Sequence, residues 1–124
     1  MRQRARPPED ISPTEFFTRW IGAAVAGDPA RQAKLGDTRA SIEFELTGGN
    51  PEPAGVYTVA IEPGGVVRGS AGAVEKPDLR VRVDVDTWRA LNRGDISAPE
   101  ALLRRRVHLS GSFLLALKLH LILG

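Results

Sequence analysis

Few residues in this sequence have the types and spacing that catalysis requires. The chain has no cysteine, which excludes disulfides, thiolate chemistry and cysteine-ligated metals. The two histidines, His108 and His120, have no acidic or histidine cluster beside them at metal-ligand spacing. Ser110 begins a Ser-Gly-Ser segment that lacks the flanking glycines of a nucleophile elbow. Glu43 and Glu45 alternate with apolar residues, so we expect both carboxylates to face solvent. The sequence therefore predicts no catalytic residue and no metal site.

Composition and charge narrow the class of protein. The chain has 124 residues, of which 42% are hydrophobic and 26% charged, values typical of one soluble globular domain. The formal net charge of +2 is too small to imply nucleic-acid binding, and few exposed aromatic residues are expected for base stacking. The Arg104-Arg105-Arg106 run, with Arg2, Arg4 and Arg6, is either a solvated face or a patch that meets anionic lipid head groups. We expect no nucleic-acid partner, and a transient contact with a membrane surface stays open.

The amino-terminal segment 1–11 is polar and rich in arginine and proline. It has no apolar stretch of the kind that a secretory signal carries. Elsewhere, no run approaches the roughly 18–20 apolar residues of a membrane span. We therefore expect a flexible tail at 1–11, one domain at 12–124 and a cytoplasmic location.

Capping residues and hydrophobic periodicity predict the elements that must position any site. Ser12, Pro13 and Glu15 open a first helix, and Ser97 opens a later one through a second capping box. Asp86 is expected to cap a short helix that stops near Gly94. The predicted strands cover 42–46, 56–61, 66–68, 79–85 and 107–110, and the other predicted helices cover 29–35 and 113–123. This order predicts an α+β fold with a mainly antiparallel sheet.

The predicted helix at 113–123 is unusually apolar. Lys118 and His120 are its polar residues, and at 100° per residue its apolar positions nearly surround the axis. Eleven residues span about 16 Å, which is too short to cross a bilayer. Such a helix must be covered on more than one side. The cover is the protein's own core, a partner subunit or a ligand in a cavity.

A set of short motifs occurs in a fixed order along residues 12–124. Its segments are Glu15-Phe16-Phe17, Thr47-Gly48, Val56-Tyr57-Thr58, Gly64-Gly65-Val66, Pro77-Asp78-Leu79, Trp88 with Gly94, and Ala116-Leu117-Lys118-Leu119. This ordered set resembles the sterol carrier protein 2 (SCP2) family, in its bacterial stand-alone form. Two departures are Arg104-Arg105-Arg106 before the last strand and Gly111-Ser112, where the family has Gly-Asp.

The resemblance implies a five-stranded, mainly antiparallel sheet with helices packed on one face. It also implies an apolar tunnel between the sheet and the helices, bordered by the last helix, that binds sterols, fatty acids, fatty acyl chains or similar lipids without a cofactor. We expect inward-facing apolar residues to line this tunnel. They are Phe44, Leu46, Val81, Val83, Trp88, Leu91, Leu102, Leu103, Phe113, Leu114, Leu117 and Leu121.

The leading function is non-enzymatic binding or transfer of a hydrophobic molecule. One alternative is an enzyme that isomerises or cyclises a hydrophobic metabolite in the same pocket, which a buried His120 or Tyr57 would favour. Another is an interaction module whose apolar last helix is a homodimer face, so both a monomer and a homodimer stay open. The sequence does not name the ligand or the pathway.

Overall fold

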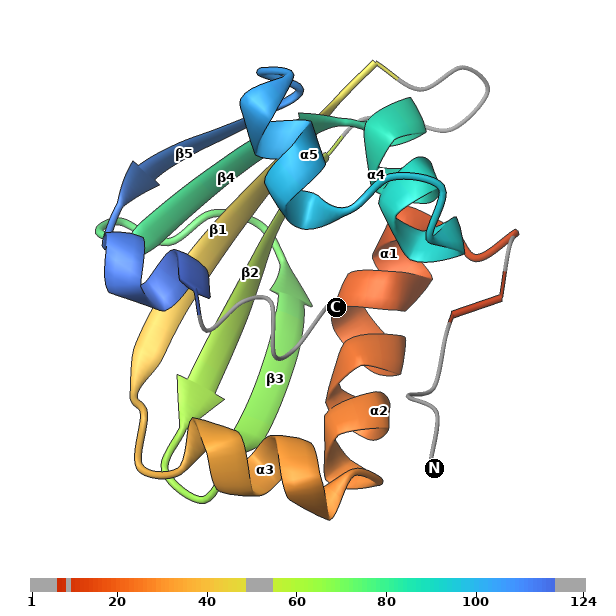
Figure 1. The fold of residues 1–124 in the computed structure, drawn as a ribbon. Coiled ribbons are helices and arrows are strands. Elements are labelled where there is room, and N and C mark those ends of the chain that lie inside the picture. The colour runs from red at the N-terminus through yellow and green to blue at the C-terminus, as the bar shows by residue number, and fades with distance from the viewer. Residues whose placement is uncertain (1–6, 9, 49–54, 118–124) are drawn as a thin grey trace.

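The computed structural model describes residues 7–8, 10–48 and 55–117, which form an α+β fold around one five-stranded sheet (Figure 1). The amino-terminal helical segment consists of α1 (Pro13–Glu15), the π-helical η1 (Phe16–Trp20) and α2 (Ile21–Ala26), and α3 (Pro29–Leu35) follows it. The strands are β1 (Ala40–Thr47), β2 (Gly55–Glu62), β3 (Val66–Ala71), β4 (Leu79–Asp84) and β5 (Val107–Gly111). Helices α4 (Val85–Arg93) and α5 (Ala98–Leu103) connect β4 to β5, and a further helix covers 113–117. The predicted class and order of elements are confirmed.

The strands lie in the order β3-β2-β1-β4-β5, so β1 is central and β3 and β5 are the edges. β1, β2 and β3 form an antiparallel meander, as their short connections predict, and β4 and β5 are also antiparallel. β1 and β4 pair in parallel, with Phe44 beside Val81 and Leu46 beside Val83. The sheet is therefore mixed but mainly antiparallel, in agreement with the sequence.

The two faces of the sheet differ in chemistry because apolar and polar residues alternate along its strands. The helices cover one face of the sheet (Figure 1), and the apolar positions of β1 are buried on that face. Glu43 and Glu45 alternate with these positions and therefore belong to the opposite face. The parallel register sets each glutamate beside an arginine of β4: Glu43 Oε2 lies 3.3 Å from Arg80 Nε, and Glu45 Oε2 lies 3.2 Å from Arg82 Nε. The expected exposure to solvent holds for Glu45, whose side chain is 46% exposed, whereas the Glu43 side chain beside Arg80 is only 14% exposed.

The first helical segment begins as predicted and packs closely on β3. Ser12 is the N-cap, and its Oγ accepts a hydrogen bond from the Glu15 N–H at 3.1 Å. At Gly69 of β3, an added Cβ would overlap the carbonyl oxygen of Phe17. Glycine is therefore required at the point where the helical backbone rests on the strand.

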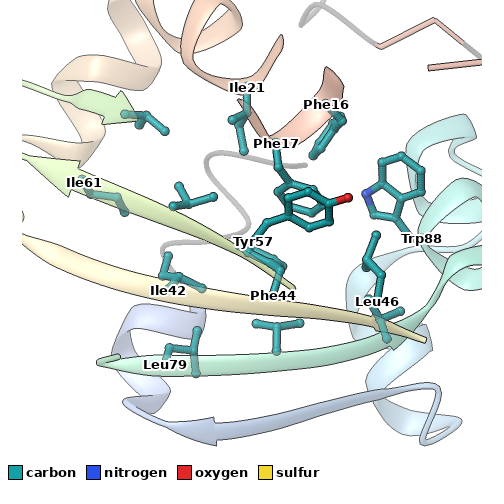
Figure 2. Close-up of a cluster of buried hydrophobic side chains, with 14 of the residues drawn as sticks. Phe16, Phe17, Ile21, Ile42, Phe44, Leu46, Tyr57, Ile61, Leu79 and Trp88 are labelled. Carbon is teal, nitrogen blue, oxygen red and sulfur yellow. The ribbon is translucent and has the colours of Figure 1, made fainter. Parts of the chain in front are cut away.

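Aromatic rings fill the centre of the core between the helices and the sheet (Figure 2). Phe17 stacks on Tyr57 with ring centroids 5.0 Å apart and meets Phe44 at 4.8 Å. Phe16 meets Trp88 edge to face at 5.3 Å. Such pairs add to the free energy gained from burial alone. The cluster ties the first helical segment to β1, β2 and α4.

Two predicted boundaries are corrected. β4 ends at Asp84, so Asp84 rather than Asp86 is the N-cap of α4, and its carboxylate accepts the Thr87 N–H at 3.0 Å. The apolar alternation continues through Val85, which concealed the change from strand to helix. β3 extends to Ala71, beyond the predicted end at Arg68. The predicted helix at 113–123 is confirmed over 113–117, and the rest of it lies outside the described residues.

Within the described ranges, no helix has both the length and the apolar character needed to cross a bilayer.

Candidate functional site

The helix-covered face of the sheet becomes less buried toward the β5 edge. The register places Leu109 of β5 beside Val81 of β4, and Val107 beside Val83. Both β4 valines are buried, whereas Val107 and Leu109 are half-buried and pack against the border of the core. The inner face of β5 therefore offers apolar surface that the described chain covers only in part.

The helix at 113–117 follows β5 directly and has apolar residues on opposite sides. Ser112 is its N-cap, because the Leu115 N–H donates to Ser112 Oγ at 3.2 Å. Leu115 belongs to the core and is 5% exposed, whereas Phe113, Leu114 and Leu117 are 71%, 75% and 63% exposed. At 100° per residue, these three side chains fall within one arc of about 100°, roughly opposite Leu115. One side of this helix is therefore anchored and the other is an apolar surface open to contact.

Helix α5 precedes β5 and lies on the same side of the sheet as the 113–117 helix (Figure 1). The Ser97 Oγ accepts the Glu100 N–H at 3.2 Å, as the predicted cap requires. Ala101 is fully buried, and Leu102 and Leu103 are 40% and 85% exposed. Exposed apolar residues thus precede β5 in α5 and follow it in the 113–117 helix. We call this group the β5 apolar face: Leu102, Val107, Leu109, Phe113, Leu114 and Leu117.

Asp84 fixes the start of α4, the helix that carries Trp88. Partial burial is the largest influence on its carboxyl group and opposes ionisation. Hydrogen bonds from the hydroxyl and the N–H of Thr87, a backbone hydrogen bond of its own and the positive charge of Arg106 together outweigh this effect. The pKa of Asp84 is therefore held below its ordinary value, and the ionised cap fixes the beginning of α4.

Trp88 has a buried polar atom within this apolar surrounding. Its indole Nε1 has no hydrogen-bond partner in the part of the chain that the structure describes. The ring itself packs against Phe16 and Phe17, with centroids 5.3 and 6.1 Å away. Buried donors are usually paired, so the Trp88 N–H can donate to an acceptor supplied from outside the chain, such as water or a ligand oxygen.

A protein-family model matches residues 21–124, a range that contains all five strands, α4, α5 and the β5 apolar face; its description is the SCP-2 sterol transfer family. This chain belongs to the SCP-2 sterol transfer family. The resemblance found in the motifs is confirmed. Membership places the general role of the chain in lipid binding or transfer.

Solved structures share the SCP-2 fold with this chain at low sequence identity. Palmitated SCP2L2 from Aedes aegypti has a TM-score of 0.68 and 21% identity, over 92% of this chain and 96% of its own. The sterol carrier protein domain 2 of Helicoverpa armigera has a TM-score of 0.68 and 19% identity, over 91% of this chain and 86% of its own. A comparison with curated protein sequences found no match.

An alkylsulfatase contains a similar fold. The inverting sec-alkylsulfatase Pisa1 from Pseudomonas sp. has a TM-score of 0.63 and 15% identity over 92% of this chain. The chain spans 16% of that enzyme, so the likeness concerns one part of a much larger protein. At these identities the solved structures establish the fold.

The residues predicted to line a tunnel differ in burial in this SCP-2 fold. The buried ones belong to the core, the exposed ones lie on α5 and the 113–117 helix, and Leu91 of α4 is half-buried. Leu121 lies outside the described residues. The buried residues are Phe44, Leu46, Val81, Val83 and Trp88, and the exposed ones are Leu102, Leu103, Phe113, Leu114 and Leu117.

Sequence reasoning did not include Val107 and Leu109 among the lining residues. Their alternation with His108 places both on the inner face of β5, so period-two spacing in 107–110 was the signal that could have found them.

The described side chains that were weighed as catalytic candidates either lie away from the β5 apolar face or already share a hydrogen bond within the chain. His108 is exposed and pairs in register with Arg82, on the solvent-facing side of the sheet. Tyr57 is buried, and its hydroxyl shares a hydrogen bond of 2.9 Å with Thr14 Oγ1. His120 lies outside the described residues. Among the residues that are described, no group of three or more His, Cys, Asp or Glu side chains could hold a metal ion.

Proposed function

We propose that this chain binds a hydrophobic ligand in an apolar tunnel between its sheet and its helices and carries that ligand without changing it chemically. The ligand class is a sterol, a fatty acid, a fatty acyl chain or a similar lipid. Membership of the SCP-2 sterol transfer family supports this class. The structurally similar SCP2L2 of Aedes aegypti was solved in palmitated form, which favours a fatty acyl chain.

One observation carries the proposal: the 113–117 helix buries Leu115 and exposes Phe113, Leu114 and Leu117. Large apolar side chains gathered on one exposed arc mark a surface that contacts something else. The half-buried Val107 and Leu109 belong to the strand that leads into this helix. A lipid chain lying along the inner face of β5 would cover both sets of residues.

Hydrophobic burial alone is sufficient for such binding. Each methylene removed from water contributes about 0.8 kcal/mol, so a chain of about fifteen methylenes gains on the order of 12 kcal/mol before ordering costs. The Trp88 N–H offers one polar contact for an acceptor oxygen, which would fix the direction in which the ligand enters.

A titration with a fluorescent fatty acid tests the proposed wall. Leu117→Glu and Leu114→Glu place a charge on the exposed arc, and both should fold because their side chains lie mostly in solvent. We expect each variant to lose affinity by at least about tenfold, since the carboxylate would be desolvated by the ligand. Val66→Glu is the matched control, because Val66 is an exposed apolar residue on β3. Unchanged affinity in both folded variants would exclude this wall.

Quenching of tryptophan fluorescence tests the interior of the tunnel separately. Trp20→Phe leaves Trp88 as the sole tryptophan, and a fatty acid brominated at mid-chain quenches an indole that lies near it. We expect saturable quenching of Trp88 by the brominated acid and none by the unbrominated one. Native mass spectrometry of protein from its host would identify a retained ligand, and release of that ligand unaltered distinguishes a carrier from an isomerase or cyclase.

A further inference from the structure

Helix α5 ends in a turn that places an arginine where glycine is usually found. The Arg106 N–H donates to the Ala101 carbonyl at 2.9 Å, and the Arg105 N–H donates to the Leu102 carbonyl at 3.0 Å. Arg105 has a φ of 57°, in the left-handed region. This pair of hydrogen bonds around a left-handed residue is the Schellman motif, whose left-handed position favours glycine because a Cβ is strained there.

Helix α4 ends in the same motif with the expected residue. Gly94 has a φ of 79°, and the N–H groups of Asp95 and Gly94 donate to the carbonyls of Ala90 and Leu91 at 2.9 and 3.1 Å. In the described part of the chain, Arg105 is the non-glycine residue with positive φ. Backbone geometry therefore does not explain an arginine at 105, and its side chain is the feature that needs an explanation.

The surroundings of Arg105 combine positive charge with exposed apolar surface. Leu103, two residues earlier, is the most exposed of the large apolar side chains that the structure describes, at 85%. Arg105 forms no ion pair with any residue in the described ranges, whereas Arg104 Nη2 lies 2.9 Å from Glu100 Oε2. Arg106 attracts Asp84. The turn thus presents one unpaired guanidinium beside one leucine that faces solvent.

We propose that this turn, 102–106, is a docking tip for an anionic lipid bilayer. Leu103 inserts among the acyl chains, and Arg105 binds phosphate oxygens of the head groups. At a membrane interface the acyl chains lie just beneath the phosphates, so a leucine and a neighbouring guanidinium can contact both layers at once. The planar guanidinium can also donate two hydrogen bonds to one phosphate. The inference rests on the proposed function, because a lipid carrier must receive and release its ligand at a membrane. Docking at this tip would hold α5, and with it one border of the β5 apolar face, against the lipid.

Flotation with vesicles tests the tip, with phosphatidylcholine vesicles compared against vesicles that also contain phosphatidylglycerol. Arg105→Gly removes the charge and puts the preferred residue at the left-handed position, so the fold is retained. We expect it to weaken binding to anionic vesicles about fivefold, the effect of one basic residue at such a surface. Arg105→Glu should weaken it further, and Leu103→Ser should weaken binding to both kinds of vesicle.

Arg39→Gln is the matched control, because it removes one positive charge from another exposed arginine. Arg39 precedes β1, and β1 begins at the end of the sheet opposite the turn 102–106 (Figure 1). It should bind vesicles as the parent does. Equal losses for Arg39→Gln and Arg105→Gly would overturn the proposal, since net charge alone would then explain binding. The proposal would also be overturned if the parent protein did not bind anionic vesicles. It would likewise be overturned if the protein bound no vesicles and formed a homodimer that Arg105→Glu dissociates.

The fatty-acid titration in vesicle-free solution separates this proposal from the proposed function. Arg105→Gly should bind the fluorescent fatty acid with the parent's affinity. Loss of vesicle binding with full fatty-acid affinity supports the docking tip. A parent protein that binds fatty acid but no vesicle overturns the tip and leaves the ligand-binding function standing.

Discussion

Leu115 and Leu117 are two residues apart in one helix, yet Leu115 is buried in the core and Leu117 is mostly exposed. Two residues correspond to a rotation of about 200° around a helix, so the two leucines point in nearly opposite directions. This arrangement divides the 113–117 helix into an anchoring side and a contact side. It also allows the two roles to be tested by separate substitutions.

Leu115→Ala should destabilise the ligand-free protein by about 3 kcal/mol, because it removes buried methylenes and leaves a cavity. Leu114→Ala on the same helix should change the free energy of unfolding by less than about 0.5 kcal/mol, since that side chain lies in solvent. Urea unfolding of the two variants measures the difference. Similar losses for both would mean that the contact side is covered in solution.

Arg105→Gly should stabilise the protein by about 1 kcal/mol, because glycine relieves the strain of a left-handed residue. Gly94→Ala should destabilise it by about the same amount, since it introduces that strain in the matching turn of α4. Thermal and urea unfolding of the two variants would report opposite signs. A destabilised Arg105→Gly variant would show that the arginine contributes to the fold.

Gly69→Ala should destabilise the protein by about 3 kcal/mol or prevent folding, because the new methyl group would overlap the carbonyl of Phe17 and push the helical segment off β3. Gly27→Ala is the control. There an added Cβ would meet its closest neighbour, the Ala23 carbonyl oxygen, at an ordinary contact distance of 3.5 Å. Circular dichroism and urea unfolding should show a nearly unchanged Gly27→Ala variant.

Asp84→Ala should cost about 1 kcal/mol at neutral pH, because α4 loses its N-cap. The folded-state pKa of Asp84 lies below its ordinary value of 3.8, so the ionised carboxylate stabilises the fold fully above that value. Its contribution is lost as the pH falls through the lower folded-state pKa. The stability gap between parent and variant should therefore shrink in acid.

Asp86→Ala provides the comparison for that experiment. Asp86 lies in the first turn of α4 but is not its cap. Its removal should cost only the few tenths of a kcal/mol that a charge near a helix start contributes. A larger effect at Asp86 than at Asp84 would contradict the assignment of the cap.

Much of the fold could be predicted from local patterns. Alternation in β1 and β4 identified buried and solvent-facing residues, because one face of this sheet is covered and the other carries the Glu43–Arg80 and Glu45–Arg82 pairs. Ser12 and Ser97 marked helix starts because their hydroxyls accept N–H groups three residues later. The boundary at Asp84 was missed, since apolar alternation continued one residue into the helix.

The candidate site was less predictable. A helix that is apolar all round has no polar side to orient it, so the sequence could not indicate that Leu115 is buried and Leu114 exposed. The left-handed conformation of Arg105 was also invisible, because arginine has no preference for that region. Both features depend on how the turn after α5 and the start of the 113–117 helix are placed by β5.

The parallel pairing of β1 with β4 also has a consequence for biogenesis. The meander of β1, β2 and β3 can form once residues 40–71 have left the ribosome, but β1, the central strand of the complete sheet, still lacks its second neighbour. Until 79–84 emerge from the ribosome, the flank of β1 is an open template for any other extended chain. In the interval between these two moments of translation, a nascent chain therefore carries an unpaired strand edge that can pair with another copy.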